Sequence, residues 1–410
     1  MQKKNQNRLS IDFSNPLIVY LLVWILTLYL YSIEFTNNLR GLNSSTNLLI
    51  WSSIVVFTTF YGIIYAIRFL LTRNLKNRLL DATKQNTELT ILRFEKVINR
   101  IFKFWFFFTI LEIIFFKGIP LISVVVLHQY DLDYKAFGIP TLHGLLNACY
   151  YTSVVGFFIL YRFKKENKYL KRVIIMLLWP ILVMSRAAML WVLVEILCVY
   201  FLMNRINLKK IFLIFSCIIG FIIIFGILGD TRGGEIDNFT TSTFVSEKYQ
   251  GIAENIPTGF VWVYLYATTP INNIVLNVNN LKPQYSFKYS LVGLIPSFIR
   301  DKIYDETDKY SVELDDEAFN VSSFFANYMH DFGLIGAVIF VSVLQLISIL
   351  FYFSAKTGKL GSIVSYSVLF YALFTSVFFD NFISLVTVFQ IILGFYINFF
   401  VYKLKQPKYV

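Results

Sequence analysis

The chain has 410 residues, of which 57% are hydrophobic and 15% are charged, whereas soluble globular proteins carry about 25% charged residues. Several apolar runs reach about 20 residues, enough to cross a hydrocarbon layer roughly 30 Å thick. These features exclude a soluble globular protein and predict an all-α polytopic membrane protein. The formal net charge of +12 would suit a nucleic-acid partner, but its distribution along the chain argues against one.

The apolar segments predict ten membrane-spanning helices in a single membrane domain covering residues 1–410. No cleavable signal peptide is expected, because basic residues precede a full-length first span without a small-residue cleavage pattern. The predicted spans are 16–33, 47–67, 101–116, 141–161, 172–184, 188–203, 211–229, 323–353, 361–379 and 382–402.

Basic residues are concentrated in alternate connections between these spans. The positive-inside rule therefore places those connections and both termini in the cytoplasm, with the other connections outside. The same distribution explains the net charge as a topology signal, so no nucleic-acid partner is expected. The connections with most of the 37 basic residues and few of the 25 acidic ones are 1–15, 68–100, 162–171, 204–210, 354–360 and 403–410.

The larger connections differ in character on the two sides. Residues 68–100 place apolar residues at roughly helical spacing among lysines and arginines, which predicts a cytoplasmic amphipathic segment on the membrane surface. On the opposite side, 117–140 forms a short extracytoplasmic loop and 230–322 a large, acidic one. The apolar stretches of the large loop are too short or too interrupted to span, so interfacial helices packed on the membrane body are expected. Chemistry or recognition should therefore occur on the outer face.

Arg186 lies in the longest apolar run, residues 173–203, in which the only other charged residue is Glu195. A guanidinium cannot lose its charge, and at the centre of a membrane helix it costs roughly 3 kcal/mol. We therefore expect a helical hairpin with an outward-facing turn at Ser185-Arg186, where the guanidinium binds phosphate oxygens. The alternatives are an arginine at an ordinary outer turn and one paired with a carboxylate such as Asp331.

Other polar residues near the predicted outer boundary are further candidates. Arg232 follows the next span in a glycine-rich stretch and suits a phosphate or sugar, or else a solvated turn. His330 and Asp331 enter an apolar helix, where a histidine can move a proton near neutral pH; the alternative is a structural role. Candidate sugar-binding or supporting residues are His143, Arg300, Asp315 and Asp316.

Two glutamates and three cysteines lie inside apolar segments. Glu112 and Glu195 could each pair with a basic group or serve in a proton path. The cysteines form no disulfide framework and no Cys/His metal spacing, so no metal site is expected. The sequence also contains no glycine-rich nucleotide-binding motif, which disfavours ATP-driven transport and a nucleotide-sugar enzyme.

Short motifs follow one another in order through most of the chain. They are Gly118-Ile119-Pro120-Leu121, Phe137–Gly144, Ser185-Arg186, Arg232 and Asn320–Gly336. The series resembles the bacterial oligosaccharide repeat-unit polymerases, called Wzy or O-antigen polymerases.

The resemblance implies a helical glycosyltransferase fold of the GT-C kind in the bacterial plasma (inner) membrane, with the active site facing the extracytoplasmic side. Such enzymes join undecaprenyl-diphosphate-linked repeat units by transferring the growing glycan from its lipid carrier to the next lipid-linked unit. The lipid-linked oligosaccharide is thus donor and acceptor, with a flippase and a chain-length regulator as expected neighbours in the membrane. The product would be O-antigen of lipopolysaccharide or a related surface polysaccharide.

The resemblance also implies roles for individual residues. Arg186 and Arg232 would hold the donor diphosphate, and no cofactor is expected. An acceptor hydroxyl needs a base or an orienting acceptor, for which His330 and Asp331 are the candidates, the acidic residues of 301–317 being an alternative.

Two other functions stay open at this point. A flippase or transporter of lipid-linked oligosaccharide would be expected to show paired halves and charges spread through the membrane depth, and neither is evident in the sequence. An O-antigen ligase shares the expected architecture and is not separated from a polymerase by the sequence.

Overall fold

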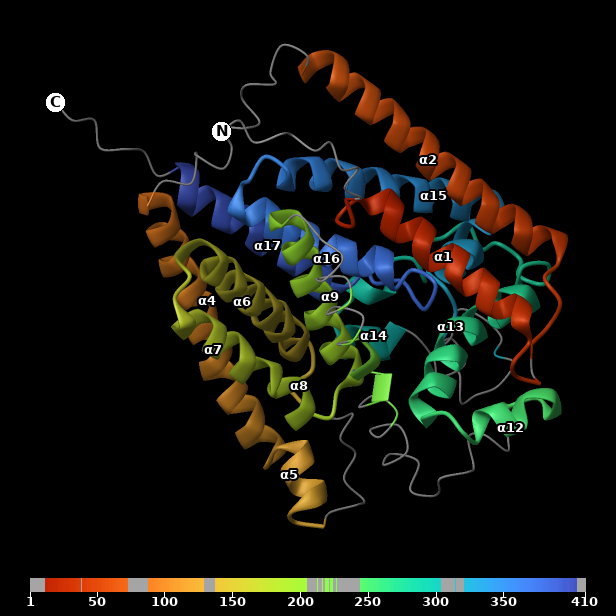
Figure 1. Cartoon of the computed structure of the whole chain (residues 1–410), viewed down its shortest axis with the longest axis horizontal. Coiled ribbons are helices and arrows are strands. Elements are labelled where there is room, and N and C mark those ends of the chain that lie inside the picture. Colours follow the sequence, from red (N-terminus) through yellow and green to blue (C-terminus); the bar gives the residue numbers. More distant parts are fainter. Residues whose placement is uncertain are drawn as a thin grey trace, which may run out of the picture.

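The computed structural model is helical throughout the part of the chain that it describes (Figure 1). Seven of these helices are long and apolar enough to cross a membrane, which confirms a polytopic helical membrane protein. An isolated bridge between Thr36 and Val245 is formed outside any strand. The described residues are 12–37, 39–72, 88–128, 137–204, 244–303 and 321–403, with 212, 216, 218–220, 222–223, 226 and 314.

The seven apolar helices match seven of the ten predicted spans in position. They are α1 (Pro16–Ile33), α2 (Ser44–Thr72), α4 (Glu88–Phe116), α6 (Leu142–Lys164), α9 (Arg186–Met203), α15 (Phe325–Ala355) and α17 (Leu385–Asn398), the last of which reaches spanning length with its π-helical continuation to Tyr402. The other helices named below are α5 (Pro120–Val125), α7 (Asn167–Leu177), α8 (Trp179–Leu182), α12 (Gln250–Ala253), α13 (Thr258–Asn277), α14 (Ser297–Ile303) and α16 (Leu360–Phe374).

The remaining three predicted spans have different outcomes. The span predicted at 361–379 is the shorter apolar helix α16. The span predicted at 172–184 is not one helix, because it divides into α7 and α8 at Leu178. Pro180 lies in the first turn of α8, where its missing N–H prevents a continuous helix through this point. The span predicted at 211–229 falls largely outside the described residues.

Residues 88–100, the described second part of the predicted amphipathic segment, are not separate from the span that follows. They form the first part of α4, which continues without a break through the predicted third span. Phe94 and Ile98 are fully buried, and a Cβ added at Gly156 of α6 would lie 2.5 Å from the Ile98 side chain. Part of the apolar spacing in this region therefore reflects packing against α6, while Leu89 and Leu92 stay exposed; contact of this region with the membrane surface stays a prediction.

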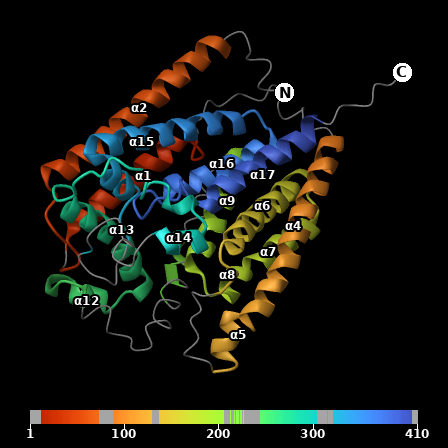
Figure 2. The ribbon, with the colours of Figure 1, turned by 180° about the vertical axis from the view of Figure 1, so that it is seen from behind.

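Helix α16 lies at the centre of the bundle, with α4, α6 and α7 on one side and α1, α2 and α15 on the other (Figures 1 and 2). All its residues from Leu360 to Leu373 are buried. It packs backbone to backbone against α17, because a Cβ added at Gly361 would lie 2.1 Å from the carbonyl oxygen of Gly394. Small residues permit this close approach between membrane helices.

Helix α1 packs on the C-terminal part of the chain. The Trp24 indole donates a hydrogen bond of 3.0 Å to the Ser376 hydroxyl, across 352 residues of sequence. Just before α1, the Asp12 carboxylate lies 2.6 Å from the Lys356 ammonium, which follows α15. The start of the described chain is therefore held in part by elements that follow it by more than 300 residues.

The predicted interfacial helices of the large loop include α13, which is longer than the sequence suggested. It runs for 20 residues with Pro270 inside it, although a proline removes one helical hydrogen bond. The two asparagines that seemed to interrupt it make tertiary contacts instead. Asn272 accepts a 3.1 Å bond from the Tyr31 hydroxyl, and Asn273 donates a 2.8 Å bond to the Val321 carbonyl. These bonds fasten α13 to the bundle.

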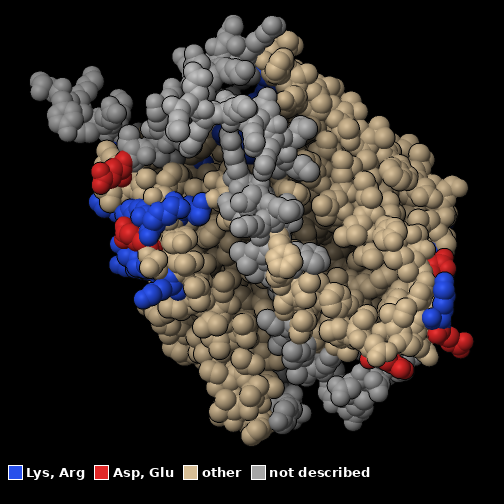
Figure 3. Space-filling model, viewed as in Figure 1, with Lys and Arg blue, Asp and Glu red and all other residues tan. Residues whose placement is uncertain are grey.

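The connections gather at two ends of the bundle. We call the end where α4 finishes and α6, α9 and α17 begin the site end, and the opposite one the basic end. Described lysines and arginines lie together over α4, α6 and α7 near the basic end, beside a long uncharged surface (Figure 3). Among them, Lys164 pairs with Glu95 at 2.5 Å. Which end faces the cytoplasm stays a prediction.

Candidate functional site

A cavity of about 280 Å³ lies at the site end, between the beginning of α6, the α8–α9 turn and the α16–α17 turn. Aromatic side chains contribute much of its wall. The polar side chains that line it are His143, Asn147, Ser185, Asn381 and Ser384. Among the described residues it is therefore a place where a polar ligand could enter the bundle.

Arg186 stands beside this cavity as the first residue of α9. The preceding residue, Ser185, lines the cavity and caps the helix by accepting a 3.3 Å hydrogen bond from the Ala188 N–H. The guanidinium Nη2 donates a 3.2 Å bond to the Tyr266 hydroxyl. Its carbon lies 5.6 Å from the centroid of the Tyr266 ring and 5.8 Å from that of Trp262, within range for cation–π attraction.

The helix break at Ser185-Arg186 confirms the turn predicted from the sequence. Arg186 therefore lies at a helix N-terminus and not in the middle of a span. The first N–H groups of a helix have no partner within the helix, and its dipole favours negative charge there. A guanidinium next to such N–H groups provides a binding place for an anion.

His143 and Glu112 form a pair at the beginning of α6. The His143 Nδ1 lies 3.1 Å from Glu112 Oε2 and 3.2 Å from Oε1. The Glu112 side chain is buried, and its Oε1 also accepts a 3.1 Å bond from the Ile139 N–H. Because His143 lines the cavity, this pair brings a titratable group to the place where Arg186 begins its helix.

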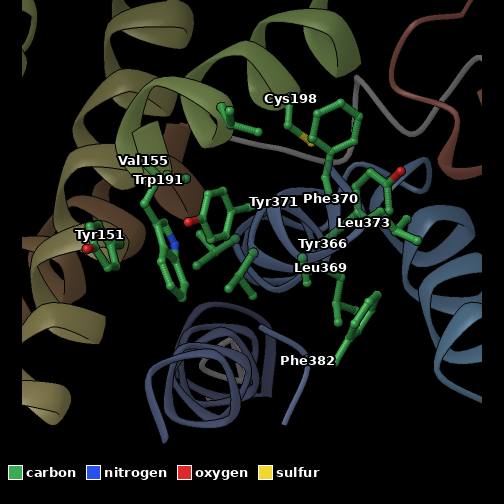
Figure 4. Close-up of a cluster of buried hydrophobic side chains, with 14 of the residues drawn as sticks. Tyr151, Val155, Trp191, Cys198, Tyr366, Leu369, Phe370, Tyr371, Leu373 and Phe382 are labelled. Atoms are coloured by element: carbon green, nitrogen blue, oxygen red, sulfur yellow. The ribbon is translucent and has the colours of Figure 1, made fainter. Parts of the chain in front are cut away.

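Three of the rings that line the cavity, Tyr151, Trp191 and Tyr371, lie side by side (Figure 4), and Glu195 supports this stack. The Glu195 carboxylate accepts a 2.9 Å bond from the Trp191 indole and bonds of 2.8 and 2.9 Å from the Gln390 amide. Trp191 lies between Tyr151, 4.8 Å away and nearly parallel, and Tyr371, 4.1 Å away. Since both faces of the indole are covered, Trp191 can offer only its edge to a ligand.

Asp331 is fully buried and its carboxylate is occupied by hydrogen bonds. It accepts from the Ser290 N–H at 2.7 Å and from the Ser290 hydroxyl. The Tyr289 N–H and the Ser286 hydroxyl add bonds of 3.2 and 3.3 Å. The hydrogen-bond partners of the Asp331 carboxylate thus all lie in residues 286–290 of the large loop, and Arg186 is not one of them.

The helix around His330 is kinked at Gly333, whose φ of 70° interrupts α15. The kink releases backbone carbonyls of the preceding turn, and the carbonyl of Asp331 accepts a 2.7 Å bond from the Tyr285 N–H. The His330 ring lies 4.0 Å from that of Tyr289, centroid to centroid. His330 and Asp331 therefore belong to one contact with the large loop, and neither is among the described residues that line the cavity.

The α16–α17 turn joins this contact to the cavity. The Tyr328 hydroxyl, one turn before Asp331 in α15, donates a 2.6 Å bond to Asp380, and the next residue, Asn381, lines the cavity. A Cβ added at Gly293 in the large loop would lie 2.1 Å from the Ile383 carbonyl. The α16–α17 turn therefore contacts both α15, through Tyr328, and the large loop, at Gly293.

The buried carboxyl group of Asp380, in this turn, should make the stability of the protein depend on pH. Burial raises the pKa of Asp380 to about 6, although bonds from Tyr328 and from the Phe382 N–H lower it. A pKa raised in the folded state gives stability that is full below the unfolded value near 4 and is lost as the pH rises through about 6. We expect Asp380→Asn to remove this loss, measured as the thermal unfolding midpoint of the detergent-solubilised protein between pH 4 and 6.

Asp12 provides a matched control with the opposite sign. Burial raises its pKa, but bonds from Lys356 and Ser14 outweigh that effect and the net pKa is lowered. Its contribution to stability is present above the unfolded value and is lost as the pH falls below about 4. Asp12→Asn should therefore leave the interval from pH 4 to 6 unchanged. Parallel curves for wild type and Asp380→Asn in that interval would contradict the prediction.

The other predicted site residues are placed as follows. Arg300 is exposed on the short helix α14, while Arg232, Asp315 and Asp316 lie outside the described residues. Sequence reasoning did not find the Glu112–His143 pairing. The sequence offered one signal for it: Glu112 lies near the end of one predicted span and His143 near the beginning of the next, so both were expected at the same side of the membrane.

Comparisons with known proteins give no identification, since the chain matches no protein-family model, no curated protein and no solved structure. Within the described ranges, no group of three or more histidine, cysteine or acidic side chains could hold a metal ion.

Proposed function

We propose that the protein is a lipid-diphosphate-dependent glycosyltransferase that polymerises oligosaccharide repeat units on the outer face of the bacterial plasma membrane. It would transfer the growing glycan from undecaprenyl diphosphate to the next lipid-linked unit, making O-antigen or a related surface polysaccharide. The observation that carries the proposal is Arg186 at the N-terminus of α9, beside a cavity at the site end.

Diphosphate chemistry requires such an arrangement. When the sugar–phosphate bond breaks, negative charge develops on the leaving phosphate oxygen, and fixed positive groups aimed at it lower the barrier. A guanidinium offers two parallel donors to phosphate oxygens, and the first N–H groups of α9 add to them. The sequence supplies Arg232 as the second expected ligand.

The size of the cavity also supports a sugar as ligand. Its 280 Å³ is near the lower end of the roughly 300–1,000 Å³ of small-molecule pockets. It therefore suits the end of a glycan better than a whole repeat unit. Asn147, Asn381 and Ser384 in its wall carry the amide and hydroxyl groups that sugar hydroxyls can bind.

Deleting the gene and examining the surface glycan on a gel tests the proposal. A polymerase deletion keeps glycan with a single repeat unit and loses the ladder of longer chains. Loss of all units would instead indicate a flippase, and a full ladder left on the lipid carrier would indicate a ligase. Restoration of the ladder by the wild-type gene is the control.

A further inference from the structure

We infer that His143 is the general base of the polymerisation and that Glu112 is its positioning residue. The inference rests on the proposed function and assigns the proton transfer to the part of the cavity wall formed by the beginning of α6. It differs from the expectation based on sequence, which gave this role to His330 or Asp331.

The contact between the two side chains fixes the chemistry of the imidazole. Glu112 as a carboxylate can only accept hydrogen bonds, so at 3.1 Å it holds the proton of a neutral His143 on Nδ1. The other ring nitrogen, Nε2, then carries a lone pair and can take a proton. The imidazolium formed by that transfer is stabilised by the adjacent carboxylate, as in a nucleophile–base–acid arrangement.

The loop before α6 holds the imidazole in place. Gly138 has a φ of +108°, and a Cβ there would lie 2.6 Å from His143 Cγ and Nδ1. The Phe137 ring contacts the imidazole edge to face at a centroid distance of 5.7 Å. The Ile139 N–H binds Glu112 from the same loop. Both partners of the pair are therefore fixed by one short segment.

Accessibility also favours His143 over the acid expected from the sequence. The His143 side chain is 32% exposed and lines the cavity. The carboxylate of Asp331 is fully buried and holds the segment around Ser290. A base must reach the hydroxyl proton directly or through one water, and His143 satisfies this requirement for a ligand in the cavity.

The proposed step is balanced as follows. A hydroxyl oxygen of the acceptor sugar forms a bond to the anomeric carbon of the donor glycan, and its proton passes to His143 Nε2. The bond from the anomeric carbon to the phosphate oxygen breaks, and its electron pair leaves with undecaprenyl diphosphate, beside Arg186. The imidazolium later returns the proton to water.

Other ionisable groups lie near His143 and would affect a pH profile. Tyr150 and Tyr151 on α6 and Tyr371 on α16 share the cavity wall. Three charged residues are also close in sequence to this region. Arg186 and Asp380 are each adjacent to a residue of the cavity wall, Ser185 and Asn381 respectively, and the exposed Lys117 directly follows α4. Glu112 differs from all of these because its carboxylate bonds the imidazole directly, so its neutral variant should give the clearest shift.

The experiment uses full-length protein in detergent with lipid-linked repeat units extracted from the deletion strain. His143→Gln keeps a donor for Glu112 but no base, and its kcat should fall by about 100-fold or more, with little change in KM. Imidazole added to His143→Ala should restore part of the rate.

In Glu112→Gln the acid limb of the rate–pH profile should move to lower pH, because the imidazolium loses its ion partner. His128→Asn serves as a control histidine.

Two results would overturn the inference. One is near-wild-type kcat in His143→Gln. The other is loss of activity without imidazole rescue, together with an unmoved acid limb in Glu112→Gln, which would give the pair a structural role. Either leaves the polymerase proposal standing, because that proposal fails separately, when gene deletion removes all glycan units.

Discussion

Replacing Arg186 with alanine should abolish long glycan chains while the protein remains in the membrane. The variant loses the guanidinium that we place on the leaving diphosphate, and removing one fixed donor to a developing oxyanion costs about 10²–10³-fold in kcat. Arg186→Lys should recover only part of the rate, because an ammonium keeps the charge but not the paired planar donors. The ladder on a gel and the initial rate with extracted lipid-linked units are the measurements.

Arg172→Ala is the matched control for the loss of a positive charge. Arg172 also contacts an aromatic ring and donates a 2.8 Å bond, to Asn99, but it lies at the basic end. Its variant should retain the ladder at equal protein levels in the membrane. A normal ladder from Arg186→Ala would remove this arginine from the diphosphate site.

Asp331→Ala is expected to release the segment from 284 to 291 rather than to stop chemistry in a folded protein. It leaves the buried N–H groups of Tyr289 and Ser290 without their acceptor. Each unsatisfied buried donor costs about 1–3 kcal/mol. Limited trypsin digestion should therefore cut faster after Lys288, which lies within this segment and is not followed by proline.

The asparagine variant separates the structural role of Asp331 from a catalytic one. Asp331→Asn retains one acceptor oxygen, so its digestion rate should lie between those of wild type and Asp331→Ala, with activity following the digestion rate. If both variants resist trypsin like wild type but are inactive, the catalytic role expected from the sequence would be supported instead.

Features that depend on local sequence were predictable, and features that depend on distant pairing were not. The hydropathy of the sequence correctly predicted the position of seven spans. The energetic cost of a buried guanidinium correctly predicted a turn at Arg186, which is the first residue of α9. The partner of His143 is Glu112, 31 residues earlier, and no local pattern specifies such a pair. The role of Asp331 could not be predicted for the same reason. A carboxylate in an apolar helix suggests a catalytic role, and only the structure shows that backbone N–H groups of a distant segment bind it.

Helical periodicity was also ambiguous where a helix extends beyond the membrane. In residues 88–100, apolar positions among basic ones are compatible with a helix on lipid or with one packed on protein. The structure places Phe94 and Ile98 against the bundle. Asn272 was similarly ambiguous, because an asparagine in an apolar run weakens a span unless a tertiary partner such as Tyr31 satisfies it.

The dependence of α1 on late elements has a consequence for biosynthesis. Trp24 and its acceptor Ser376 are separated by 352 residues, and translation adds about 5–20 residues per second. Helix α1 must therefore reside in the bilayer for about 20–70 s before α16 is made. During that interval its indole N–H needs a temporary partner, from lipid head groups or the insertion machinery. A ribosome that stalls before residue 360 would leave α1 with its contact to α13 but without the Ser376 acceptor of Trp24, and such an incomplete bundle would be a substrate for membrane proteases.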